Sequence, residues 1–311
     1  MASREKSNAQ IWVEYAAAAT LFRLLGVLPL RAAVFVAQTI ASLAYPFLGR
    51  LRRVGLRNLE IAFPEKTLAE REALLKRALR NMARVLAYFT RFDRLSYETM
   101  PALVEYDPDP DFAASLEKVV SAGRGRIILT GHTGNWELQA LCYPLFFGPL
   151  TFLARRMDNP RIEAMVVKIR TRLGNKQIDK ENSAGAILRL MRAGGSVGVL
   201  ADVNAHPNEG IFVPFFGIPA STSTGIAMLA QRSGAVIVPM LAVWDEQKRK
   251  YKIVYRNIIE PDDSIDRKRD IERMTAECAA ATESLIREFP DQYIWIHRRW
   301  KTRPPGEEEI Y

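Results

Sequence analysis

Short apolar runs alternate with amphipathic segments through the middle of this 311-residue chain, and this alternation constrains its fold most strongly. The runs have the length and composition of buried strands. They lie at residues 126–130, 150–154, 196–201, 235–243 and 252–256. Helices are expected near residues 67–92, 112–121, 160–173, 184–192, 222–233 and 266–288. The pattern predicts an α/β fold, with a largely parallel mixed sheet that helices cover on both faces.

Ligands of such sheets gather beyond the carboxyl ends of the strands. Polar residues that directly follow a predicted strand are therefore the first candidates for a functional site.

The N-terminal stretch is unusually apolar. Residues 11–51 are rich in Ala, Leu, Val and Phe, and residues 32–49 carry no charge. A membrane-crossing helix needs about 20 apolar residues. Because the uncharged run also contains Gln38 and Pro46, spanning and interfacial insertion both remain open. A helical hairpin packed on a soluble domain would show similar apolar faces.

A basic cluster directly follows this apolar run. It consists of Arg50, Arg52, Arg53 and Arg57. Arginines in this position attract anionic headgroups and favour a cytoplasmic location of the following residues. We expect residues 1–57 to form a membrane-associating helical segment and residues 58–311 to form one α/β catalytic domain.

The formal net charge of +9 favours anionic partners, which include nucleic acid, lipid headgroups and acidic carrier proteins. The sequence shows no nucleic-acid-binding motif or basic recognition helix, so no nucleic-acid partner is expected. Cys142 and Cys278 lack metal-ligand spacing, and His206 and His297 have no neighbouring ligands. We therefore expect no metal and no cofactor.

Residues 131–137, Gly-His-Thr-Gly-Asn-Trp-Glu, leave a predicted strand and enter a predicted helix. Residues five apart on a helix are rotated by about 140°, so His132 and Glu137 can meet only if His132 precedes the helix. The two glycines permit such a turn, and Thr133 or Asn135 can cap the helix. His132 is then a candidate general base whose imidazole Glu137 orients. A capping histidine and a solvated glutamate would give the same spacing.

The segment 131–137 resembles the His-four-residues-acid motif of the bacterial lipid A late acyltransferases, the lauroyl and myristoyl acyltransferases of the lysophospholipid and glycerolipid acyltransferase superfamily. Four further passages resemble the same family in the same order. They are Arg-Arg-Met-Asp-Asn-Pro at 155–160, Leu-Ala-Asp-Val-Asn at 200–204, an aromatic-rich loop and the start of the following helix at 211–224, and the segment 292–304 that contains His-Arg-Arg-Trp-Lys.

The resemblance implies an O-acyltransferase that uses His132 and Glu137. It would move a fatty acyl chain from an acyl-carrier-protein thioester onto a hydroxyl of a lipid A precursor, in lipopolysaccharide biosynthesis. It also implies a protein of the bacterial inner membrane, whose catalytic domain lies on the cytoplasmic face.

Five residues are candidates for substrate binding under the same resemblance. They are Asn135, Arg155, Asp202, Arg298 and Arg299. Asp202 could instead orient Arg155 or a catalytic group, whereas His297 and the pair Asn159-Pro160 are expected to be structural. Two other activities stay open: acylation of another glycolipid or a lysophospholipid, such as a phosphatidylinositol mannoside, and lipid binding without catalysis.

Overall fold

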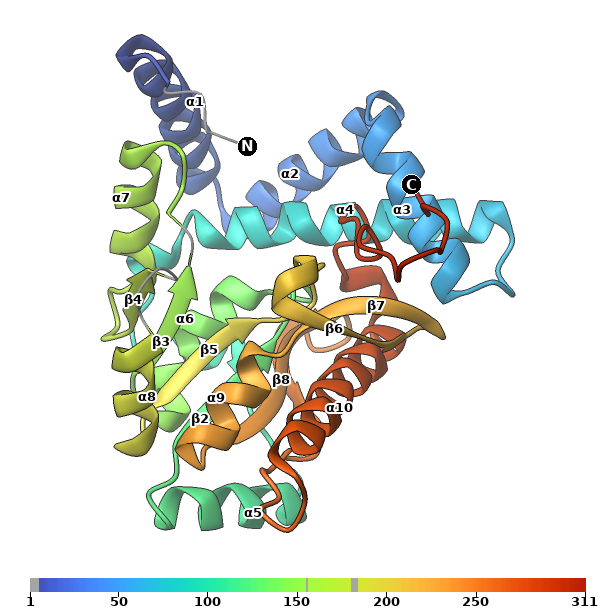
Figure 1. Cartoon of the computed structure of the whole chain (residues 1–311). Helices are drawn as coiled ribbons and strands as arrows, with labels where there is room; N and C mark the ends of the chain where they lie inside the picture. Colours follow the sequence, from blue (N-terminus) through green and yellow to red (C-terminus); the bar gives the residue numbers. More distant parts are fainter. Residues whose placement is uncertain (1–5, 155, 180–183) are drawn as a thin grey trace.

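A computed structural model describes residues 6–154, 156–179 and 184–311, and it shows a central sheet flanked by helices (Figure 1). The sheet has seven strands in the order β1-β9-β8-β2-β5-β3-β4. Their bounds are β1 Val104–Glu105, β2 Arg126–Thr130, β3 Leu150–Ala154, β4 Lys176–Asp179, β5 Ser196–Leu200, β8 Val236–Asp245 and β9 Lys250–Tyr255. Within the described strands of this sheet, β8 and β9 pair antiparallel and every other neighbouring pair is parallel. The predicted largely parallel mixed sheet is confirmed.

Ten helices have the bounds α1 Asn8–Val27, α2 Leu30–Ala44, α3 Gly49–Ala62, α4 Leu68–Phe89, α5 Pro110–Ser121, α6 Trp136–Phe147, α7 Pro160–Arg170, α8 Ala184–Arg192, α9 Gly225–Ser233 and α10 Arg267–Glu288 in the part of the chain described.

Helices cover both faces of the sheet, as expected, because alternate strand residues point to opposite sides. In β2, Ile128 belongs to an apolar cluster with α4, α5 and α6. Its neighbours Ile127 and Leu129 pack instead with α8, α9 and α10. Figure 1 accordingly places α9 and α10 on one side of the strands and α6 on the other.

The segment expected as an aromatic-rich loop is a two-stranded antiparallel hairpin, β6 Gly210–Phe215 and β7 Ile218–Ser223. Its two turn residues, Phe216 and Gly217, have φ values of 51° and 77°. Two positive φ values are typical of the tight turn whose twist matches a hairpin. Phe215 and Phe216 pack against Trp295 and Trp300, which joins the hairpin to the C-terminal segment.

The N-terminal helices pack on the long amphipathic helix α4, which begins with a capping box between Thr67 and Glu70. Helix α2 lies along α4 on the side away from the sheet (Figure 1), and Ala33 and Ala37 pack near Ala87. Small side chains let the two helices approach closely. Helices α2 and α3 are therefore joined to the rest of the structure through α4.

Much of this N-terminal segment nevertheless remains exposed and apolar. The helical stretch Leu30–Phe47 is long and apolar enough to cross a membrane by length and composition, and only 22% of it is buried. Phe35, Leu43 and Phe47 are 69%, 68% and 86% exposed. The segment thus combines a face packed on α4 with an apolar face open to its surroundings.

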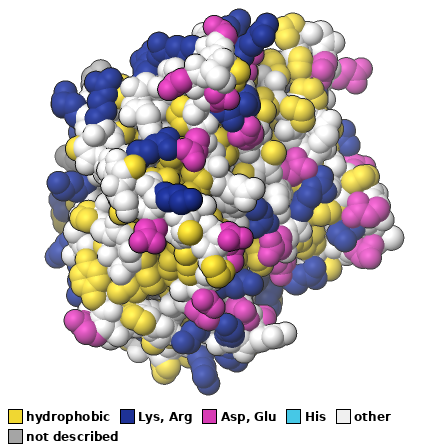
Figure 2. Space-filling view, turned by 90° about the horizontal axis from the view of Figure 1, so that it is seen from below, with side chains coloured by type: hydrophobic (Ala, Val, Ile, Leu, Met, Phe, Trp, Pro, Cys, Tyr) yellow, Lys and Arg dark blue, Asp and Glu magenta, His cyan; other side chains and the backbone are white. Residues whose placement is uncertain are grey.

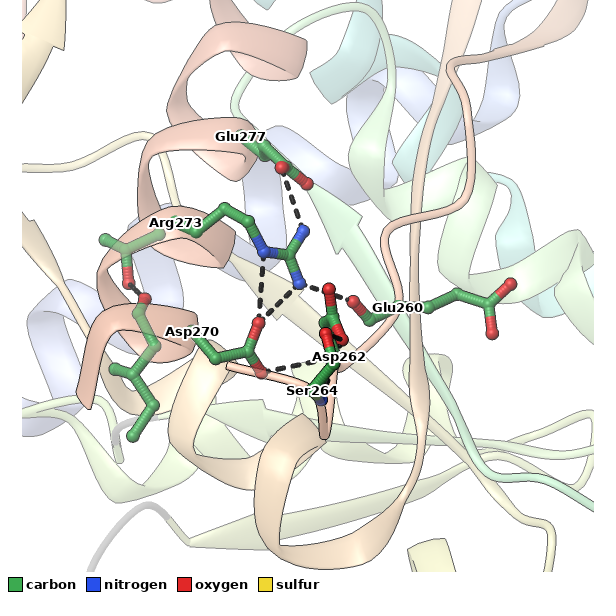
Figure 3. Close-up of polar contacts among 8 residues, drawn as sticks. Glu260, Asp262, Ser264, Asp270, Arg273 and Glu277 are labelled. Carbon is green, nitrogen blue, oxygen red and sulfur yellow. Dashed lines mark hydrogen bonds and ion pairs between the residues drawn. The ribbon is translucent and has the colours of Figure 1, made fainter. Parts of the chain in front are cut away.

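A polar cluster fixes the start of α10 (Figure 3). The buried Asp270 accepts a hydrogen bond from Arg273 Nε at 3.0 Å, while Arg273 also bonds Glu277 and the carbonyl of Glu260. The loop before α10 is held against the helix because Arg273 donates to the Glu260 carbonyl and the backbone N–H of Asp262 donates to Asp270.

Candidate active site

Residues 131–135 form the turn between β2 and α6, with His132 before the helix as predicted, and Glu137 lies in the first turn of α6. The Asn135 side chain caps α6 by accepting the N–H of Leu138 at 3.0 Å. Three backbone hydrogen bonds hold the turn: Gly134 N–H to Gln292 O, Asn135 N–H to Ala242 O, and Ile294 N–H to His132 O. The C-terminal segment and β8 therefore both position the histidine.

Gly134 is required by this close approach. Its φ is +65°, and a Cβ there would lie 2.0 Å from the carbonyl oxygen of Ala242. Any residue other than glycine would meet both a conformational and a steric cost at this position.

His132 is held by Asp202, which directly follows the neighbouring strand β5. Asp202 Oδ1 lies 3.0 Å from His132 Nδ1, and Oδ2 accepts the backbone N–H of His132 at 2.8 Å. Gly131 makes room for the carboxylate, because a Cβ there would lie 3.0 Å from Asp202 Cγ. This arrangement places the proton on Nδ1 and leaves Nε2 as the basic nitrogen.

The electrostatics of the site favour an ion pair between the side chains of His132 and Asp202. Burial lowers the pKa of His132, but the charge and hydrogen bond of Asp202, together with the charge of Glu137, outweigh it and raise this pKa. Burial likewise opposes ionisation of Asp202, yet His132 and two backbone N–H groups keep its pKa below the usual value. The carboxylate is thus placed to stabilise an imidazolium.

The expectation that Glu137 holds the imidazole is corrected by this geometry, because Asp202 occupies that position. Glu137 instead pairs with Arg170 at the end of α7, and Arg170 Nε donates to Glu137 Oε2 at 2.8 Å. The side chain lies on the first turn of α6, where it meets α7 rather than the preceding turn. The sequence pattern did not indicate Arg170, since nothing in it showed that the end of α7 meets the start of α6.

A cavity of about 310 Å³ opens beside the Glu137–Arg170 pair. Its walls come from β2, β3, β5 and α6, and they are mainly apolar. They include Ile128, Ala140, Tyr143, Leu150, Phe152 and Gly198. The cavity lies at the sheet region where ligands of parallel α/β folds are expected, next to the turn that carries His132.

The other substrate-binding candidates have different surroundings. Asn135 is fully buried as the helix cap. Arg299 is also buried, and its guanidinium donates to Ser221 O and Thr222 Oγ1, which ties the C-terminal segment to β7. Arg298 is half-buried with its guanidinium over the ring of Tyr311. Arg155 lies outside the described residues.

His297, which was expected to be structural, accepts the backbone N–H of Asn204 at its Nε2, at 3.0 Å. Across the described ranges of the chain, no group of three or more His, Cys, Asp or Glu side chains is arranged to hold a metal ion.

An α/β sheet with a carboxylate-held histidine beside a mainly apolar cavity is an arrangement found among enzymes of the α/β class. The sequence model of the bacterial lipid A biosynthesis acyltransferases matches residues 2–302, so the chain belongs to this family.

Three relatives from Escherichia coli (strain K12) span most of the chain. The lipid A biosynthesis palmitoleoyltransferase is 28% identical over 99% of this chain and 97% of its own length. The lauroyltransferase is 29% identical over 88% of this chain and 86% of its own length. The myristoyltransferase is 25% identical over 85% of this chain and 81% of its own length.

Proposed function

We propose that this protein transfers a fatty acyl chain from the thioester of an acyl-carrier protein onto a hydroxyl of a lipid A precursor, with His132 as the general base. The family supports acyl transfer in lipid A biosynthesis. The observation that carries the mechanism is the carboxylate-held imidazole of His132 beside an apolar cavity.

In this mechanism His132 Nε2 takes the proton of the acceptor hydroxyl as its oxygen attacks the thioester carbonyl. Asp202 keeps the Nδ1 proton in place and stabilises the imidazolium that forms. Collapse of the tetrahedral intermediate forms the ester and breaks the carbon–sulfur bond. The imidazolium then returns its proton to the departing thiolate, so the enzyme ends in its starting state.

Glu137 keeps a place in the catalytic machinery, although its role changes. Its ion pair fixes Arg170 at the polar end of the cavity, and its charge also raises the pKa of His132. We propose that the guanidinium of Arg170 stabilises negative charge on the reacting carbonyl oxygen, a task that suits a fixed cation in a site partly closed to water. The apolar part of the cavity would then hold the acyl chain.

We also propose that residues 1–57 associate with the inner membrane and leave the catalytic domain on its cytoplasmic face. Helix α2 lies along α4, whose charged residues could not follow it into hydrocarbon, so insertion at the interface suits it better than spanning. Of the four arginines beyond the apolar run, Arg52 and Arg57 are paired with Glu72 and Glu60. Arg50 and Arg53 remain for the headgroups.

Transfer of labelled acyl chains from acyl-carrier protein to a tetra-acylated lipid A precursor tests the proposal. Wild type should transfer, while His132→Ala should lose about 10²- to 10⁴-fold and remain folded. Transfer only from coenzyme A would refute the proposed donor. Transfer only to a lysophospholipid or a mannosylated lipid would refute the proposed acceptor.

A further inference from the structure

Two further cavities lie between α2, α4 and the β8–β9 hairpin, away from the cavity beside His132. Their volumes are about 470 and 320 Å³. Gln38, Arg84, Trp244 and Glu246 line both of them, so the two form one groove. None of its lining residues lines the cavity beside His132. We call it the α2–α4 groove.

The groove is strongly basic. Its lining contains Arg31, Arg77, Arg80, Arg84 and Arg249, against the carboxylates Glu246 and Asp291. Glu246 is already used, because it pairs with Arg84 at 3.2 Å and accepts the indole N–H of Trp244 at 2.7 Å. Most of the positive charge in the groove therefore lacks a matching carboxylate.

Three arginines at the rim are available to a ligand. The side chains of Arg31, Arg77 and Arg249 are exposed, and within the described part of the chain they make no ion pair or hydrogen bond. They come from three different elements, α2, α4 and the β8–β9 turn. Arg31 and Arg249 line the larger cavity, and Arg77 lines the smaller one. Exposed guanidinium groups of this kind are planar donors suited to phosphate oxygens.

Apolar side chains of α2 line part of the groove and continue onto the exposed face of that helix. Leu30, Val34 and Phe35 line the groove, and Phe35 also belongs to the exposed apolar face with Leu43 and Phe47. The opposite wall contains Tyr88 and Trp244, and such amphipathic rings are common at the membrane interface. A ligand here meets positive charge at one end and apolar side chains at the other.

We propose that the α2–α4 groove binds the phosphodiester headgroup of an anionic membrane phospholipid, apart from the reacting lipids. The proposal rests on the membrane association of α2 given above. An acidic carrier protein would share the charge, but a recessed groove continuous with an apolar helix face fits a lipid better. The face opposite to α2 is different, since Figure 2 shows Lys and Arg interspersed with Asp and Glu around an apolar area.

Flotation with phosphatidylcholine vesicles, with and without phosphatidylglycerol, tests the charge preference. At low salt, wild type should partition at least about 100-fold more strongly onto the anionic vesicles. Each arginine near an anionic surface contributes a factor of about 5, so Arg31→Gln/Arg77→Gln/Arg249→Gln should lower this partition on the order of 100-fold at low salt. Its binding to phosphatidylcholine should change little.

A matched triple, Arg267→Gln/Lys268→Gln/Arg269→Gln, removes the same charge from exposed residues at the start of α10. This end of α10 lies at the bottom of Figure 1, on the opposite side of the sheet domain from α2. The matched triple variant should keep the preference for anionic vesicles. An equal loss of anionic partition in both triple variants would mean that overall charge, and not the groove, sets the preference.

Trp244 provides a readout from inside the groove. Brominated phosphatidylglycerol should quench the fluorescence of Trp244 in wild type, and brominated phosphatidylcholine should quench it much less. In Trp244→Phe, the fraction of the total fluorescence that brominated phosphatidylglycerol quenches should fall. Equal quenching by the two lipids would overturn headgroup recognition. Normal flotation of the groove triple with a raised KM for acyl-carrier protein would assign the groove to the donor protein instead. If wild type floats with neither vesicle, membrane association itself is wrong.

Discussion

The imidazole Nδ1 of His132 lies 3.0 Å from Oδ1 of Asp202, and the other carboxylate oxygen accepts the backbone N–H of His132. One side chain thus fixes both the ring and the turn on which the ring stands. Asp202 is itself fixed by position, since β2 and β5 pair in parallel with Thr130 opposite Leu200. The parallel pairing of two strands therefore sets the relation between base and carboxylate.

Asp202→Asn should leave the fold intact and lower kcat by about 10³- to 10⁴-fold, because the amide favours the wrong imidazole tautomer. The carboxylate raises the pKa of His132, so its removal lowers that pKa. Since the base acts only when neutral, the acid limb of the kcat–pH profile should move to lower pH. Loss of activity without this movement would contradict the pairing. Asp263→Asn, an exposed change, should alter neither quantity.

The Glu137–Arg170 pair can be tested by a double-mutant cycle. Glu137→Gln leaves Arg170 largely buried without its partner, which should lower the free energy of unfolding by about 3 kcal/mol. Arg170→Met should cost a similar amount, and the double variant should cost less than the two single changes together. Denaturant unfolding measures all three. Additive costs would mean that the pair does not couple energetically.

Much of the fold could be predicted from the sequence, since β2, β3 and α8 begin and end where the patterns place them. The polar edge strand β4 was missed because it lacks an apolar run. The hairpin β6–β7 was expected to be a loop because the segment resembles an aromatic-rich loop of the family, and its prolines and glycines give no clear strand pattern. In both cases pairing with a neighbouring strand overrides the weak local signal.

The site was predictable only in part. The motif identified His132, and Asp202 was a candidate because it follows a strand. Their contact joins residues 70 apart in the chain, and it depends on β2 and β5 being neighbours, which periodicity does not reveal. The pairing of Glu137 with Arg170 likewise depends on how α6 packs on α7, so the local His-to-Glu spacing suggested the wrong partner for the imidazole.

The cavity beside Glu137 should set the length of the acyl chain. Ala140 lies on its α6 wall, and Ala140→Leu replaces a methyl by an isobutyl group at a helical position that tolerates leucine. The kcat/KM for the longest accepted donor should fall at least about 10-fold relative to a shorter donor. A series of acyl-carrier-protein donors measures the ratio. An equal fall for all chain lengths would place the acyl chain elsewhere.

The exposed face of α2 should anchor the protein to membranes. Phe35→Asn/Leu43→Asn/Phe47→Asn removes apolar side chains that are mostly exposed, so binding to phosphatidylcholine vesicles should fall while Tm is unchanged. Deletion of residues 1–51 is a poorer test, because Arg91 donates to carbonyls at the end of α1 and α2 covers α4. Unchanged vesicle binding by the triple variant would argue against this face as the anchor.

Two glycine substitutions should have opposite effects on stability. Gly134→Ala meets a positive φ and the carbonyl of Ala242, so it should cost about 1–3 kcal/mol from the backbone alone, with the steric clash in addition. Gly49→Ala is the matched change, because it lies at the start of α3 with open space around its Cβ. It should be neutral or stabilise the protein by about 0.4–1 kcal/mol through the unfolded state. Thermal unfolding of both variants measures the difference, and equal Tm values would show that the turn can carry His132 without a glycine at 134.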